Sequence, residues 1–314
     1  MPVPHLGALN RWAPVSQDGI QKCRKCHFNP QGAAKTFPPS RGGRPLAAMH
    51  LQRSQNKRSQ NMRILLTNDD GVFAPGLAAL EQQLRHLGEV HVVAPETEQS
   101  GVGHSITYLT PLICKSIHRE GRHWAWAVDG SPADCVKLAI AELLNDQPVD
   151  LVVSGINNGL NAGINVLYSG TVAAAIEGAF FGITSVAVSL EYDADADFQA
   201  AAVIARNVIG ELVQHSDARG KLFNLNVPTA ATESPKELRV VPMGLAQYGR
   251  AYEKRVDPGG RNYYWALWTE PQQPPPETAD VTELRKGNVT LTPLNFDLAD
   301  HQMLGKMADW GLKV

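Results

Sequence analysis

The stretch MRILLTNDDG at residues 62–71 decides the fold that this 314-residue sequence predicts. Its first half contains a short apolar run, 63–67, which is typical of a buried strand. Its second half is a polar turn with two adjacent carboxylates and a glycine. In open α/β sheets, ligands bind in the crevice at the carboxyl ends of the strands. The stretch therefore predicts a candidate site directly after the first strand.

Downstream of this stretch, segments with strand character alternate with segments with helical character. Further strands are predicted at 89–94, 105–117, 124–128, 149–154, 184–190, 222–226 and 238–242. Helices are predicted at 75–87, 131–144, 169–181 and 197–214. Pro75 and Pro132 suit the first turns of their helices, and Ser131 suits an N-cap. This alternation predicts an α/β fold with a mostly parallel sheet and helices on both faces.

The two ends of the chain differ from this pattern. Residues 1–61 are polar, cationic and without periodicity, which predicts a disordered extension, or a segment that is not translated if the protein starts at Met62. After about Gly244 the alternation stops, and aromatic, strand-like and Pro-rich segments follow, with a final strand predicted at 289–294. We expect residues 62–314 to form one domain with a protruding, β-rich C-terminal arm of the kind that makes oligomer contacts.

The bulk properties exclude several classes of protein. The formal net charge is -2, so the whole chain offers no electrostatic support for nucleic-acid binding. No apolar run reaches the roughly 18 residues of a membrane span, and the N-terminus lacks the apolar core of a secretory signal. We therefore expect a cytoplasmic protein without a membrane or nucleic-acid partner. RNA contact through the basic N-terminal segment stays open as an alternative.

Other motifs point to no competing chemistry. Cys23, Cys26 and His27 match the spacing of c-type haem attachment, but that reaction needs an exported chain and no export signal precedes them. A single Cys-x-x-Cys pair is also a poor zinc site. The sequence contains neither the phosphate-binding loop of P-loop NTPases nor the nucleophile elbow of α/β-hydrolases.

Polar segments follow several predicted strands and are expected at one edge of the sheet. Asp69 and Asp70 repel each other unless a proton or cation lies between them, and Mg²⁺ or Mn²⁺ prefers such oxygen ligands. After the next strand, Ser100 could ligate a metal or a phosphate oxygen, and His104 could act as acid or base or contact a phosphate. The alternatives are an ordinary turn and a flexible loop.

Two later segments are expected to place further candidate ligand-binding residues at the same edge of the sheet. Asn157 lies in an Asn- and Gly-rich loop and is a candidate neutral metal ligand, although such loops are also common connectors. Ser169, Gly170 and Thr171 open an Ala-rich helix, whose N-terminus could bind phosphate or be capped by Ser169 alone. A metal end and a phosphate end in one crevice predict phosphoester hydrolysis. The same groups could also bind a nucleotide without hydrolysing it.

The combined motifs resemble the SurE family of 5'-nucleotidases, also called survival protein E. The matching segments are 62–71, 93–95, 100–101, 129–135, 154–157, 168–172, 257–261 and 289–293. The resemblance implies a Rossmann-like domain and a C-terminal arm exchanged between subunits of a homodimer or homotetramer. It implies hydrolysis of nucleoside 5'-monophosphates, often with 3'-nucleotidase or exopolyphosphatase activity alongside.

The resemblance also implies a site. One Mg²⁺ or Mn²⁺ per subunit is expected, with the ligands Asp69, Asp70, Ser100 and Asn157. Asp69 or Asp70 is expected to orient the attacking water or take its proton, and Asn68 and Ser169 to contact phosphate oxygens. One departure leaves the role of Asp280 open, because many members carry Asp-Thr-Asp where this chain has Glu-Thr-Ala-Asp at 277–280. The alternative function is a nucleotide-binding regulatory protein without catalysis.

Overall fold

The computed structural model describes residues 62–313 apart from 235, 247–250 and 268–274. The expectations for residues 1–61, including those for Cys23, Cys26 and His27, lie outside the described residues. So do parts of the Pro-rich segment that follows the aromatic strand.

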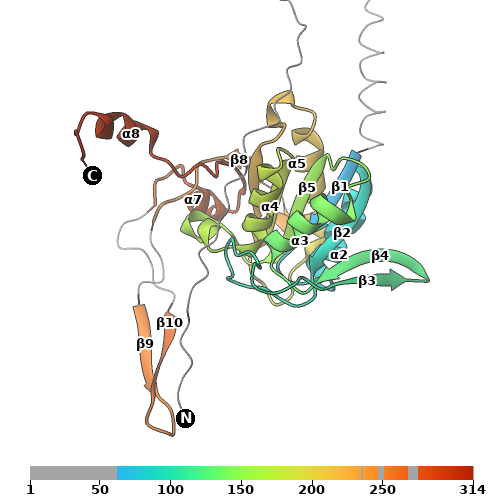
Figure 1. Ribbon diagram of the computed structural model, residues 1–314, viewed down its shortest axis with the longest axis horizontal. Coiled ribbons are helices and arrows are strands. Elements are labelled where there is room, and N and C mark those ends of the chain that lie inside the picture. The colour runs from blue at the N-terminus through green and yellow to red at the C-terminus, as the bar shows by residue number, and fades with distance from the viewer. Residues whose placement is uncertain (1–61, 235, 247–250, 268–274, 314) are drawn as a thin grey trace, which may run out of the picture. The chain divides into compact units, whose positions relative to one another are not determined.

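A nine-stranded sheet forms the centre of the fold, with the strand order β3-β4-β2-β1-β5-β6-β7-β11-β8 (Figure 1). Its strands are β1 Met62–Thr67, β2 Gly88–Pro95, β3 Cys114–Arg119, β4 Arg122–Val128, β5 Leu151–Asn158, β6 Thr184–Leu190, β7 Leu222–Val227, β8 Leu238–Val240 and β11 Val289–Leu294. Six neighbouring pairs are parallel, and only β3 with β4 and β7 with β11 are antiparallel. The predicted mostly parallel sheet is confirmed.

The strand order reverses at β1. The chain places β2 on one side of β1 and later returns to place β5 on the other side. The carboxyl ends of β1 and β5 therefore meet at a topological switch point. Connections leave these two ends in opposite directions, so a crevice opens between them where open α/β sheets bind their ligands.

Four helices cover the two faces of the sheet (Figure 1). They are α2 Pro75–Leu84, α3 Pro132–Leu138, α4 Gly170–Phe180 and α5 Phe198–Leu212. α2 packs against α5, and α3 packs against α4. In β1, Ile64 and Leu66 join the core beneath α2 and α5, whereas Leu65 joins the core beneath α3 and α4. Alternate side chains of one strand thus bury both faces, which confirms helices on both sides.

Some predicted boundaries are wrong for identifiable reasons. The 131–144 helix begins as predicted, with Ser131 accepting a hydrogen bond from Asp134 N, but it changes to a π-helical turn at Ala139–Leu143. The predicted strand at 105–117 forms only from Cys114 onward. Before that point the helix cap holds the chain, because Asp134 accepts hydrogen bonds from both the amide and the hydroxyl of Thr107. Those polar contacts replace a sheet partner.

The C-terminal segment contains elements that the periodicity did not reveal. α7 spans Asp280–Arg285, and α8 spans His301–Ala308 with no buried residue. β9 Ala251–Val256 pairs antiparallel with β10 Asn262–Leu267 as a separate two-stranded sheet. The expected β structure in the arm is confirmed, and its role in oligomer contacts stays a prediction. No helix in the described part of the chain is long and apolar enough to cross a bilayer.

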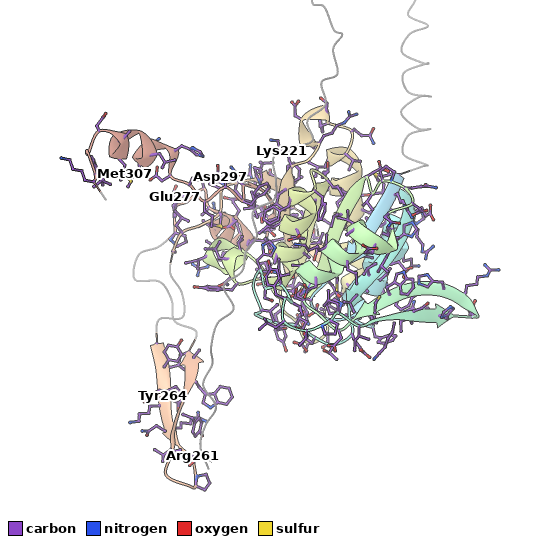
Figure 2. The ribbon with its side chains drawn as sticks, viewed as in Figure 1. Lys221, Arg261, Tyr264, Glu277, Asp297 and Met307 are labelled. Atoms are coloured by element: carbon purple, nitrogen blue, oxygen red, sulfur yellow. The ribbon has the colours of Figure 1, made fainter. Side chains whose placement is uncertain are left out.

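The turn between β9 and β10 is closed by one carboxylate. Asp257 accepts hydrogen bonds at 2.9 Å from the backbone amides of Gly259 and Arg261, and at 2.8 Å from Arg261 Nε. Figure 2 shows Arg261 at this turn and Tyr264 on β10. Tyr264 and Trp265 are exposed aromatic side chains within the described chain.

Two helical glycines give a matched test of how closely α4 packs on the sheet. A Cβ added at Gly178 would lie 2.5 Å from Ser185 Oγ and 2.7 Å from Val152 Cγ2, both on buried strands. A Cβ added at Gly210 in α5 would meet only the end of Leu87, at 3.3 Å. We expect Gly178→Ala to lower the free energy of unfolding by about 2 kcal/mol through overpacking.

Gly210→Ala serves as the control, because alanine is the better helix former by up to about 1 kcal/mol and little opposes it there. Urea denaturation followed by circular dichroism measures both variants. Equal stability of the two variants would contradict the close packing of α4.

Candidate active site

A cavity of about 460 Å³ opens at the switch point between the ends of β1 and β5. It is lined by Asp69, Asp70, Glu98, Ser100, Gly101, Asn157, Asn158, Leu160, Asn161, Asn165, Tyr168, Ser169 and Tyr192. These residues come from the turns after β1, β2 and β6, from the end of β5 and its following loop, and from the start of α4. All four predicted metal ligands are among them, together with Ser169.

Asp69 is held rigidly beneath the cavity. Asp69 is only 4% exposed, and the Thr171 hydroxyl donates a hydrogen bond to its Oδ1 at 2.5 Å. Burial raises the pKa of Asp69, and the Thr171 hydrogen bond opposes that rise. Thr171 itself is fully buried and its hydroxyl holds Asp69, and the predicted contact of Thr171 with substrate stays a prediction.

Asp70 is more open to the cavity and carries the clearest electrostatic signature. Burial and then the charge of Asp69 raise the pKa of Asp70 to about 6, against a hydrogen bond from the Asn158 backbone that lowers it. Glu98 adds a smaller repulsion. Two carboxylates that resist ionising together are stabilised by a bound cation, since a cation favours the charged form of both.

Ser100 and Asn157 add neutral oxygen atoms. The Ser100 hydroxyl donates to Glu98 Oε1 at 2.6 Å, so its own lone pairs stay available. Asn157 Nδ2 donates to Gly159 O at 2.6 Å, which leaves the carboxamide oxygen as the free end. The sequence predicted Asn157 in a loop, whereas it lies within β5. The parallel pairing of Asn157 with Ser189 of β6 keeps it in the sheet.

The donor set fits a hard divalent cation. Two carboxylates, one hydroxyl and one carboxamide supply only oxygen, which is the ligand type that Mg²⁺ and Mn²⁺ select. No group of three or more His, Cys, Asp or Glu side chains suited to a metal occurs among the residues that the structure describes.

Asn68 is not among the residues that line the cavity, and its predicted contact with phosphate stays a prediction. Its side chain is completely buried, and Nδ2 donates to Gly71 O at 3.0 Å. Gly71 has φ of +100°, a conformation that glycine adopts without strain. Asn68 thus closes the turn that presents the two aspartates. Its Oδ1 is buried without a hydrogen-bond partner.

His104 also lies away from the residues that line the cavity. Its Nε2 is 3.0 Å from Oε2 of the buried Glu177 in α4, and its ring stacks on Phe180 at 5.4 Å between centroids. Lys137 Nζ is 3.7 Å from the other oxygen of Glu177. His104 therefore ties the loop after β2 to α4, and its predicted acid–base or phosphate role stays a prediction.

The start of α4 combines capping with close approach. Ser169 Oγ accepts a hydrogen bond from Val172 N at 3.1 Å, so Ser169 caps the helix, and it also lines the cavity. A Cβ added at Gly170 would lie 2.9 Å from Asp69 Cβ. Gly170 thus lets the helix end reach Asp69, and it does not line the cavity itself.

Sequence reasoning missed several residues of the site. Glu98, Asn158, Tyr168 and Tyr192 line the cavity, and Tyr192 follows β6 at the same sheet edge, a position that could have indicated it. Asp280, whose role was open, is fully buried and accepts hydrogen bonds at 2.8 Å from Gly163 N and Gly244 N. It therefore anchors the segment that leads to Tyr168.

A doubly wound α/β sheet with an oxygen-rich cavity at its switch point defines a Rossmann-like protein with a candidate ligand site at that cavity. The family model described as survival protein SurE matches residues 64–250. The chain belongs to the SurE family.

Named relatives agree with this assignment. The chain is 78% identical over 252 residues to 5'-nucleotidase SurE of Rhodopirellula baltica, covering 80% of this chain and 100% of that protein. It is 43% identical over 255 residues to 5'-nucleotidase SurE of Desulforudis audaxviator, covering 79% and 97%. The crystal structure of SurE protein from Aquifex aeolicus superposes with a TM-score of 0.70 at 36% identity, covering 78% of this chain and 98% of that one. The predicted resemblance and fold class are confirmed.

The raised pKa of Asp70 makes the metal-free protein sensitive to pH. The folded protein holds this proton up to about pH 6, whereas the unfolded chain releases it near 3.8. The stability that Asp70 contributes is therefore present below the lower value and is lost as the pH rises through the upper one. Because Asp70 is partly exposed, we expect Asp70→Asn to raise the free energy of unfolding in EDTA by roughly 1–2 kcal/mol at about pH 7.5.

The difference between Asp70→Asn and the parent protein should vanish at about pH 3, where the Asp70 carboxyl is protonated in both the folded and the unfolded chain. Urea denaturation in EDTA at the two pH values measures it. Asp195→Asn, at an exposed aspartate, is the control. If Asp70→Asn is less stable than the parent protein at the higher pH, ionised Asp70 does not destabilise the metal-free fold.

Proposed function

We propose that this chain is a divalent-cation-dependent 5'-nucleotidase that hydrolyses nucleoside 5'-monophosphates to nucleoside and phosphate. The names of its relatives support the reaction class. The observation that carries the cation requirement is the charge of the cavity. Asp69, Asp70 and Glu98 line it, and no Lys, Arg or His is among its described lining residues.

A phosphate group cannot enter such a cavity unaided. Each phosphate monoester is a dianion near neutral pH, and three carboxylates around it would repel it strongly in a partly buried site. A Mg²⁺ or Mn²⁺ ion held by Asp69, Asp70, Ser100 and Asn157 would offset most of this negative charge, present a positive centre to the phosphate and supply Lewis acidity for the phosphoryl group. The cation thus serves both substrate binding and chemistry.

The protein's own groups divide the remaining tasks. Asp69, fixed by Thr171, and Asp70, more open to the cavity, are the groups able to orient the attacking water or accept its proton. Ser169 can donate its hydroxyl proton to a phosphate oxygen while its lone pair caps α4. The free amides at the start of α4 favour negative charge nearby. These contacts hold only the phosphoryl group, so we extend the proposal to 3'-nucleotides and short polyphosphate.

Removal of the cation tests the proposal. We expect phosphate release from AMP and GMP to fall at least about 100-fold in excess EDTA, because the carboxylates then repel the substrate and no Lewis acid is present. Added Mg²⁺ or Mn²⁺ should restore it. A malachite-green assay of released phosphate measures the rate, and full activity in excess EDTA would exclude the cation.

Asp69→Asn tests the ligand set directly. The variant keeps the shape of the side chain and loses its charge, so we expect turnover of AMP to fall at least about 100-fold while the fold survives. Circular dichroism and the melting temperature report the fold, and Asp195→Asn is the matched control on an exposed aspartate. Near-normal turnover by Asp69→Asn would refute the assignment. Tight AMP binding by the parent protein with no turnover would favour the regulatory alternative.

A further inference from the structure

Two exposed tyrosines line the cavity beside the acidic groups. Tyr168 is 61% exposed and Tyr192 is 71% exposed. They are the aromatic side chains among the described residues of the cavity wall, and they come from different loops. Tyr168 follows the 3-10 helix at Gly163–Leu167, and Tyr192 lies two residues after β6. Neither ring contributes to a hydrophobic core cluster of the described chain.

The backbone around both tyrosines is held by hydrogen bonds although the rings are exposed. Tyr168 N donates to Asn165 O at 3.0 Å, and Tyr168 O accepts from Gly103 N at 3.1 Å. Next to Tyr192, the carboxamide of Asn158 exchanges two hydrogen bonds of 3.4 Å with the backbone of Asp193. Fixed attachment points reduce the ordering that a ligand must impose, so the rings are suited to binding.

The cavity therefore has two chemically different parts. The carboxylates, Ser100 and Ser169 suit a cation and a phosphate, whereas the tyrosine rings offer flat apolar faces. A nucleoside monophosphate has the same division, with a charged phosphate at one end and a flat aromatic base at the other. Base–aromatic stacking tolerates every base, because each base has a π-face.

We propose that Tyr168 and Tyr192 form the base-binding platform of this site and make nucleotides better substrates than sugar phosphates without a base. This inference rests on the proposed function and specifies its substrate class. Stacking on one aromatic side chain changes affinity by about tenfold or more. We expect kcat/KM of the parent protein to be at least about tenfold higher for AMP than for ribose 5-phosphate.

The test compares AMP with ribose 5-phosphate, which differ by the base. Tyr192→Ala is the main variant, since Tyr168 adjoins the Ser169 cap and its loss could disturb α4. We expect Tyr192→Ala to lower kcat/KM for AMP about tenfold more than it lowers kcat/KM for ribose 5-phosphate. Tyr192→Phe should keep the preference, because it keeps the ring. Tyr108→Ala removes a tyrosine that is 81% exposed but does not line the cavity, and is the matched control.

The possible results separate the base-binding inference from the proposed nucleotidase function. Comparable losses of kcat/KM with AMP, GMP, CMP and UMP in Tyr192→Ala would support stacking, and a loss confined to one base would contradict it. An unchanged preference in both Tyr192→Ala and Tyr168→Ala would overturn the inference while leaving the nucleotidase function intact. No hydrolysis of any of these substrates by the parent protein would overturn the proposed function and this inference with it.

Discussion

The repulsion between Asp69 and Asp70 is the interaction on which the rest of the site depends. Both groups lie in a turn that the sheet buries from below, and burial raises the pKa of each. Such a pair is unfavourable in the absence of a cation, because two neighbouring carboxylates in low dielectric cannot both ionise cheaply. The Thr171 hydroxyl offsets part of that cost by donating a hydrogen bond to Asp69, and the Asn68 amide closes the turn that carries both carboxylates.

Distant parts of the chain converge to present this pair. β5 lies beside β1 and carries Asn157 at its end, while Gly170 allows the start of α4 to approach Asp69 closely. Asp280, from near the C-terminal end of the domain, anchors the loop before Tyr168 through buried hydrogen bonds. The crevice at the switch point thus depends on packing across the whole sheet.

The contents of the cavity explain how an acidic site can serve an anionic substrate. In the proposed function its lining carboxylates would hold a cation, and the phosphate would bind to that cation instead of to basic side chains. The exposed tyrosines add the apolar surface that a phosphate alone would not need. Membership of the SurE family and the naming of its relatives as 5'-nucleotidases agree with this division of the site.

The sequence by itself determined the α/β alternation, the Ser131 cap and the set of polar residues at the strand ends. These features are local, since the period of apolar residues reports which face is buried and capping residues act within one turn. Only the tertiary structure decided which polar residues face the cavity. Thr171 reaches Asp69 across 102 positions, and His104 reaches Glu177 across 73. Such contacts depend on how helices and strands pack, which no local pattern encodes, so only the tertiary structure shows that Thr171 and His104 contact carboxylates distant in sequence.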